Sequence, residues 1–216
     1  MPILTGLAPD PRQPGYRLVE VDRGRFASLP AEALAGLPLS VGDALSDALV
    51  ARLQALADLE AACRAAVRLL ATRSRSRADL RRRLVQKQHP PAAADGALAR
   101  LEARGLLEDG RFAREYAASH APRGRGPARL LRDLLAQGVE RGTAEEAVRA
   151  ALADEGIDPA DAARAVAEKR ARQLADLPLA VRRRRLLAYL ARRGFPGSEV
   201  RQLVEEVCNP GAPPRG

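Results

Sequence analysis

Apolar residues recur every three or four positions from about Asp43 to Cys208. This spacing matches the 3.6-residue turn of an α-helix, so it predicts an almost entirely helical region, broken into separate helices by proline and glycine. Residues 1–58 differ. Residues 16–21 alternate between apolar and polar side chains, residues 22–24 are typical of a turn, and residues 25–27 predict a returning strand. We therefore expect an N-terminal extension with a β-hairpin and helix.

The helical region repeats its pattern about every fifty residues. Residues 78–84 align with residues 128–134 at an offset of 50, and residues 130–148 align with residues 186–204 at a further offset of 56. Each copy predicts three helices joined by turns. Because one copy cannot bury its apolar side chains alone, neighbouring copies should stack into an elongated, curved, mainly α-helical body. The expected three-helix repeats cover residues 59–108, 109–157 and 158–208, and a disordered tail covers residues 209–216.

Individual residues indicate where these helices begin and end. Pro127 suits a first helical turn, because the N–H that it lacks would have no helical partner there. Gly138 and Gly194 are expected to end helices in the left-handed conformation. Thr143 is expected to be an N-cap, with Glu146 completing a capping box. Four aromatic residues at repeat positions are expected to anchor the core rather than to stack on bases: Phe112, Tyr116, Tyr189 and Phe195.

Charge is distributed unevenly along the chain. The whole sequence carries 36 Lys+Arg against 27 Asp+Glu, a formal net charge of +9. Residues 1–72 hold 7 basic and 8 acidic residues, whereas residues 73–216 hold 29 and 19, so the net charges are −1 and +10. The excess is nearly all arginine, whose planar guanidinium suits phosphate. This pattern is typical of a protein that binds nucleic acid or a partner coated with it.

The arginines gather in three clusters, each next to the second helix of a repeat. Stacked repeats would align the clusters, and phosphate neutralisation would make binding strongly dependent on salt. Arginine runs can also be solvated faces that only balance acidic helices, an alternative that explains a single residue better than three clusters at repeat spacing. The candidate residues for binding nucleic acid or a partner coated with it are Arg73, Arg75, Arg77, Arg81, Arg82, Arg83 and Lys87, then Arg123, Arg125, Arg129 and Arg132, then Arg182, Arg183, Arg184, Arg185, Arg192 and Arg193.

Other kinds of site find little support in the sequence. Acidic residues form no arrangement with a nucleophile or base, so no catalytic residues are predicted and the protein is not expected to be an enzyme. Two histidines and two cysteines at no ligand spacing predict neither a metal site nor a cofactor. The absence of an apolar run of 18 residues and of a basic leader predicts a cytoplasmic protein without membrane contacts.

Four segments resemble motifs of the RecX family of recombinase regulators. Residues 125–139 are similar to the central signature of that family, and residues 105–113 to the link before it. Residues 75–80 and 190–195 resemble the motifs of the first and third repeats. The resemblance covers residues 59–208 in order and register. It departs at residues 88–91, Gln-His-Pro-Pro, where the family has glycine followed by a hydrophobic residue, and at His120, where a basic residue is usual.

The resemblance implies a non-catalytic regulator that binds the RecA filament on single-stranded DNA. Proteins of this family lie along the groove of the filament and suppress ATP hydrolysis, strand exchange and LexA co-cleavage. They thereby modulate recombination, DNA repair and the SOS response, and we expect a monomer. Two alternatives are open from the sequence: a helical-repeat protein that binds duplex DNA directly through helix-turn-helix-like units, and an adaptor for another acidic protein. The arginines and apolar residues of the second helices favour phosphate contacts over the reading of bases.

Overall fold

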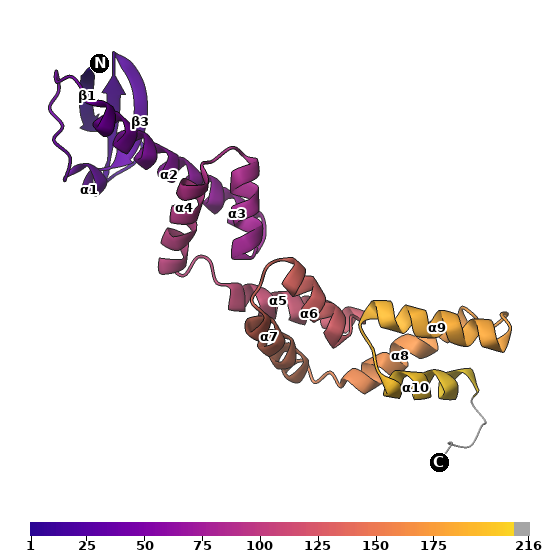
Figure 1. The fold of residues 1–216 in the computed structure, drawn as a ribbon. Coiled ribbons are helices and arrows are strands. Elements are labelled where there is room, and N and C mark those ends of the chain that lie inside the picture. Colours follow the sequence, from indigo (N-terminus) through magenta and orange to yellow (C-terminus); the bar gives the residue numbers. More distant parts are fainter. Residues whose placement is uncertain (210–216) are drawn as a thin grey trace. The chain divides into compact units, whose positions relative to one another are not determined.

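The computed structural model describes residues 1–209 and opens with a three-stranded antiparallel sheet (Figure 1). The strands β1 (Leu4–Pro9), β2 (Tyr16–Val21) and β3 (Gly24–Pro30) follow in the order β1-β2-β3, with Val19 opposite both Leu7 and Ala27. The predicted hairpin is therefore present as β2 and β3. The sequence analysis missed β1, because Gly6 and Pro9 weaken its strand pattern.

The chain divides into two compact units. The first comprises Met1–Ser74 and Leu80–Leu107, and the second comprises Arg75–Asp79 and the chain from Glu108 onward. In the first unit, the short helix α1 (Ala31–Leu34) leads to α2 (Asp47–Thr72), followed by α3 (Arg77–Gln86) and α4 (Pro91–Ala103). The beginning of α2 packs on the sheet around Val19 and Leu53, whereas its later turns pack on α4.

The second unit contains two sets of three helices. The first set is α5 (Asp109–His120), α6 (Pro127–Ala136) and α7 (Arg141–Asp154), with the 3-10 turn η1 (Ala121–Arg123) after α5. The second set is α8 (Pro159–Arg172), α9 (Leu179–Arg193) and α10 (Ser198–Cys208), which lie together in Figure 1. Each set encloses its own apolar core. The protein is thus mainly α-helical, with three three-helix domains and a small N-terminal sheet, as predicted.

Every middle helix of the three domains is built to one pattern. Each buries two leucines one turn apart and then closes with a backbone hydrogen bond between residues five positions apart. The buried pairs are Leu80 and Leu84, Leu130 and Leu134, and Leu186 and Leu190. The closing bonds run from His89 N to Leu84 O, from Val139 N to Leu134 O and from Phe195 N to Leu190 O, at 3.0 to 3.1 Å. Gln88 therefore keeps the cap conformation, with φ of 66°, although glycine is absent there.

Three of the predicted helix boundaries are confirmed and one is wrong. Gly138 and Gly194 are left-handed caps, with φ of 79° and 91°, and Pro127 opens α6. Thr143 is not an N-cap, because α7 begins earlier, where the Glu140 carboxylate accepts a hydrogen bond from Thr143 N at 2.9 Å. The predicted tail at residues 209–216 lies, apart from its first residue, outside the described residues.

Within the second unit, helix starts meet helix ends at two equivalent places, which we call the glycine junctions. At one, Gly126 N donates to Arg193 O at 2.7 Å, and Ala128 N donates to Gly194 O at 3.3 Å. At the other, Ser76 Oγ donates to Gln137 O at 2.5 Å, and a Cβ added at Gly138 would collide with Ala78. The contacts are related by the sequence offsets of 50 and 56. Carbonyls at a helix end, which lack a helical partner, thus accept from backbone N–H groups at one junction and from a serine hydroxyl at the other.

Candidate nucleic-acid interface

Two arginines of the second cluster converge on one carboxylate inside the α5–α7 domain. Arg125 Nη1 lies 2.9 Å from Asp133 Oδ2, and Arg129 Nε lies 2.8 Å from Asp133 Oδ1. Arg125 also donates to the Tyr116 hydroxyl at 2.6 Å and stands 5.9 Å from the centre of that ring. Burial and then Asp133 raise the pKa of Tyr116. Because the Asp133 side chain is only 15% exposed, the ion pairs of Arg125 and Arg129 stabilise the domain from within.

The first cluster is likewise partly committed to contacts within the protein. Arg75, with its side chain 7% exposed, pairs with Asp79 at 2.9 Å. Arg81 forms two bonds to Asp95, from Nε at 2.6 Å and from Nη2 at 2.9 Å. Arg77 donates its backbone N–H to Asp109 at 2.7 Å. The exposed members of this cluster are Arg73, Arg81, Arg82 and Lys87, while Arg77 and Arg83 are half-buried.

Half of the third cluster ties α9 to its neighbours. Arg182 donates to Cys208 O, and Arg183 pairs with Glu205 at 2.5 Å, so both residues close α9 onto α10. Arg193 donates from Nε to the Tyr189 hydroxyl at 3.1 Å and from Nη1 to Arg123 O at 3.2 Å. Arg182 and Arg183 therefore link helices within the domain, whereas Arg193 links the domain to η1 of the preceding one.

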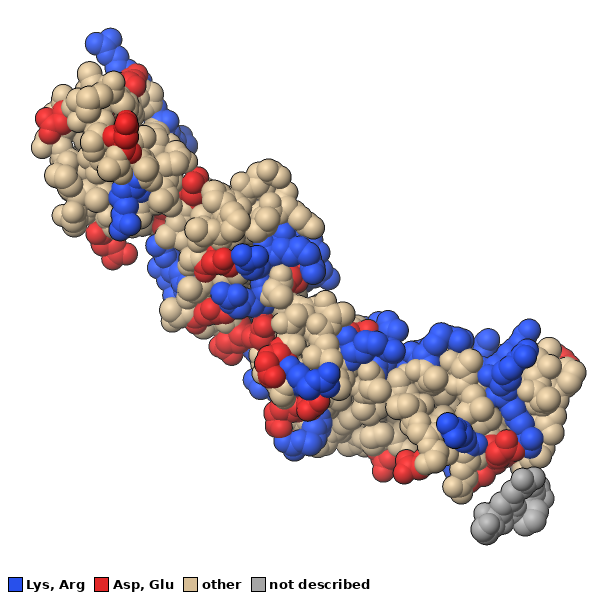
Figure 2. Space-filling model, viewed as in Figure 1, with Lys and Arg blue, Asp and Glu red and all other residues tan. Residues whose placement is uncertain are grey.

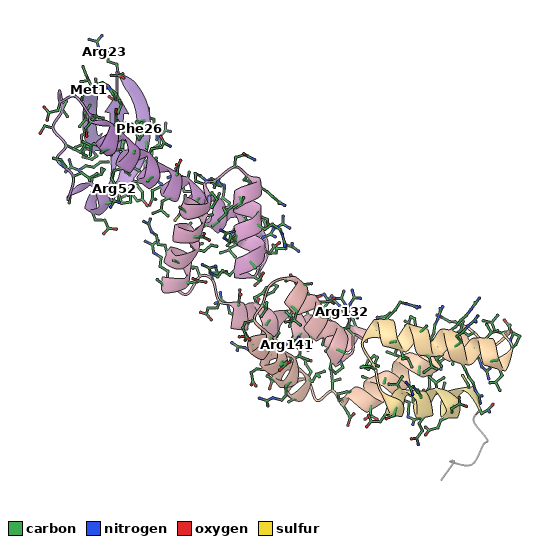
Figure 3. The ribbon with its side chains drawn as sticks, viewed as in Figure 1. Met1, Arg23, Phe26, Arg52, Arg132 and Arg141 are labelled. Atoms are coloured by element: carbon green, nitrogen blue, oxygen red, sulfur yellow. The ribbon has the colours of Figure 1, made fainter. Side chains whose placement is uncertain are left out.

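Five exposed arginines of the second and third clusters have no side-chain partner within residues 1–209. They are Arg123, Arg132, Arg184, Arg185 and Arg192. Figure 3 shows Arg132 projecting outward from α6. In Figure 2, basic atoms of this unit gather along the edge formed by α6 and α9, whereas acidic and basic atoms occur together on the opposite edge. The unit thus presents a basic edge, defined here by these five arginines, that is able to bind phosphate.

The structure also identifies residues that the sequence analysis missed. Asp133 could have been found, because it follows Arg129 by four residues on a predicted helix. Ser76 could not, because its partner Gln137 is 61 residues away. Tyr189 was expected in the core, but it lies outside the buried clusters, between the guanidiniums of Arg170 and Arg193 at 5.2 and 5.3 Å from its centroid. Phe112 and Phe195 are buried core residues, as predicted, and Tyr116 packs against the core.

Neither a metal-binding cluster nor a membrane-spanning helix occurs among the described residues. No group of three or more His, Cys, Asp or Glu side chains in residues 1–209 is arranged to hold a metal ion. None of the described helices is long and apolar enough to cross a membrane. The His120 ring stacks on Tyr116 with centroids 4.2 Å apart, and its Nδ1 lies 2.8 Å from Tyr116 O.

The helical domains match three family models. Residues 62–101, 109–148 and 157–204 correspond to the first, second and third three-helix domains of RecX. The regulatory protein RecX of Halorhodospira halophila is 38% identical over 144 residues, which cover 66% of this chain and 85% of that protein. The regulatory protein RecX of Bacillus velezensis is 27% identical over 208 residues, which cover 96% of this chain and 78% of that protein.

A solved structure shares the fold. The crystal structure of a regulatory protein RecX superimposes with a TM-score of 0.73 at 18% identity, and the match covers 95% of this chain and all of that one. The likeness includes the N-terminal sheet region as well as the three helical domains, since nearly the whole chain is matched.

Proposed function

Because the chain belongs to the RecX family of regulatory proteins, we propose that it binds the RecA filament on single-stranded DNA and inhibits its ATPase, strand-exchange and LexA co-cleavage activities. The relatives are named as regulatory proteins, which fits a protein that acts by binding rather than by catalysis. In this proposal the chain acts as a cytoplasmic monomer that modulates recombination, DNA repair and the SOS response.

The observation that carries the proposal is the basic edge of the second unit. Its arginines are exposed and lack carboxylate partners among the described residues, so their charge is available to a ligand without breaking an internal ion pair. The glycine junction between Gly126 and Gly194 fixes α6 against α9, which keeps the arginines of the two helices at a constant spacing. Fixed spacing suits a partner that repeats its phosphates regularly, as a nucleic-acid strand in a filament does.

In the first cluster, Arg75 and Arg81 are less available to a ligand, because each already forms an ion pair with a carboxylate. We propose that the exposed residues Arg73 and Lys87 take part in binding. Arg75, Arg125 and Arg129 would support the surface from within rather than contact DNA.

A triple variant tests this assignment. Arg132→Gln, Arg184→Gln and Arg185→Gln together remove three charges from the basic edge without breaking a recorded ion pair. The matched control removes three charges from local pairs on α5 and α7, by Arg111→Gln, Arg141→Gln and Arg149→Gln. Co-sedimentation with RecA filaments should fall for the first variant only, and the salt dependence of binding should decrease by about one counterion per lost phosphate contact.

If the two triple variants lose equal amounts of filament binding, binding depends on net charge rather than on the basic edge. Tight, sequence-selective binding to duplex DNA in the absence of RecA would instead support the direct DNA-binding alternative. Circular dichroism of both variants should retain the helical signal, since every substituted arginine is at least partly exposed.

A further inference from the structure

A cavity of about 460 Å³ lies where the second and third three-helix domains meet within the second unit. Its walls come from η1 and the residue after it, from α8 and from α9. The floor is apolar and includes Ala121, Ile157 and Val166, and no Asp or Glu side chain lines it. The cavity is therefore a hollow with one sign of charge in a protein that holds 27 acidic residues.

Three cations surround this cavity. Arg123 and Lys169 are exposed, and neither side chain has a hydrogen-bond or ion-pair partner within residues 1–209. Arg193 is held in place by its bonds to Arg123 O and to the Tyr189 hydroxyl, which leaves its Nη2 atom without a recorded bond. Two exposed cations and one cation held by hydrogen bonds thus line the same cavity, an arrangement that favours an anion with more than one charged oxygen.

Close packing of the two domains forms the floor beneath these cations. A Cβ at Gly124 would stand 2.8 Å from Val166 Cγ2, so the turn after η1 lies directly against α8. Tyr189 forms a side wall, and Arg170 lies against its ring on one side with Arg193 nearby. The Arg170 Nε atom is buried and has no hydrogen-bond partner among the described residues. An apolar floor below cationic and aromatic walls offers separate places for a base and its phosphates.

We propose that this cavity takes one nucleotide of single-stranded DNA, with its base on the apolar floor and its flanking phosphates on Arg123, Lys169 and Arg193. The volume falls within the range of small-molecule sites, which is large enough for a nucleotide. The site continues the basic edge, because Arg123 belongs to both. An unpaired base can enter a cavity without the cost of breaking a base pair, so the site would favour single strands over duplex DNA. This inference rests on the proposed function, since it names the chemistry that part of the same surface would recognise.

Filling the cavity without changing charge tests the proposal. Ala165 is an exposed residue of α8 that lines the cavity, so Ala165→Trp should fill the space at little cost to folding. Ala153→Trp, at an exposed position of α7 that does not line this cavity, is the control. Fluorescence anisotropy of the full chain with oligothymidylate and with an abasic strand of equal length measures the contribution of the base.

The wild-type chain and Ala153→Trp should bind oligothymidylate at least about fivefold more tightly than the abasic strand, as expected for one base in contact with a protein surface. Ala165→Trp should lose this preference while its salt dependence stays unchanged. Lys169→Gln should weaken binding to both strands by several-fold more than Arg201→Gln, which removes an exposed charge from α10.

Equal affinity of the wild-type chain for the two strands would overturn the proposal, as would identical behaviour of the two tryptophan variants. The result is separable from the proposed function. Inhibition of RecA without a base preference would overturn the nucleotide cavity alone. A base preference that Ala165→Trp abolishes, in a chain that does not inhibit RecA, would overturn the filament function alone.

Discussion

Replacing Gly126 with alanine tests the glycine junction that fixes α6 against α9. Gly126 has φ of −74° and ψ of 164°, which alanine adopts without strain, so the substitution changes only the space that the residue occupies. The added Cβ would stand 2.6 Å from Gly194 C and 2.8 Å from Phe195 Cδ1, and closer still to the Gly194 carbonyl oxygen. Ordinary carbon contacts are about 3.5–4.0 Å, so the two helix ends must separate.

The structure sets the size of the effect. Overpacking of this kind costs about 1–3 kcal/mol, and separation also weakens the bonds of Gly126 N and Ala128 N, each worth about 1 kcal/mol. We expect a total loss of about 2–4 kcal/mol in the free energy of unfolding of the second unit. Gly156→Ala is the control: Gly156 has φ of +61° and open space around its Cα, so alanine there should cost only the conformational strain, about 1–2 kcal/mol.

Urea unfolding followed by far-ultraviolet circular dichroism measures both variants, since the chain has no tryptophan to report by fluorescence. The midpoint for Gly126→Ala should lie clearly below that for Gly156→Ala. A Gly126→Ala variant as stable as the Gly156→Ala control would refute the close approach of the two helix ends, and with it the fixed spacing of arginines on α6 and α9.

Two further predictions concern carboxylates. Asp133→Asn should lower the free energy of unfolding by about 1–3 kcal/mol, because two guanidiniums lose their charged acceptor; an unchanged urea midpoint would contradict this role. The backbone N–H groups of Gly142 and then Thr143 hold the pKa of Glu140 below its usual value, so its stabilisation is present at neutral pH and is lost as the pH falls through that lowered pKa. Thermal unfolding should therefore show that the Glu140→Gln variant loses less stability than the wild type between neutral and acidic pH. Parallel pH profiles of the two proteins would contradict the role of the Glu140 carboxylate as a helix cap.

The repeating helices could be predicted because the spacing of apolar residues follows from which face of each helix is buried. Leu130 and Leu134 recur as Leu186 and Leu190, and the glycines that follow them mark the helix ends. The residues at which helices start were harder to predict. Glu140 and Thr143 are both able to cap α7, and only the backbone conformation decides that Glu140 does so.

The partners of the arginines could not be predicted from their spacing. Arg125 precedes α6 and lies eight residues from Asp133, a separation at which helical periodicity predicts no contact. Arg193 bonds Arg123 O, 70 residues away, across two domains of the second unit. Clustering in the sequence therefore predicted where positive charge collects, but tertiary contacts determine which arginines keep that charge available.

The most direct test of the central claim is a titration of this protein into a RecA ATPase assay that depends on single-stranded DNA. ATP hydrolysis should fall progressively as the protein approaches stoichiometries near that of the filament. The triple variant of Arg132, Arg184 and Arg185 should require a several-fold higher concentration than the wild type. ATP hydrolysis that stays unchanged across the whole titration would contradict the claim that this protein regulates RecA filaments.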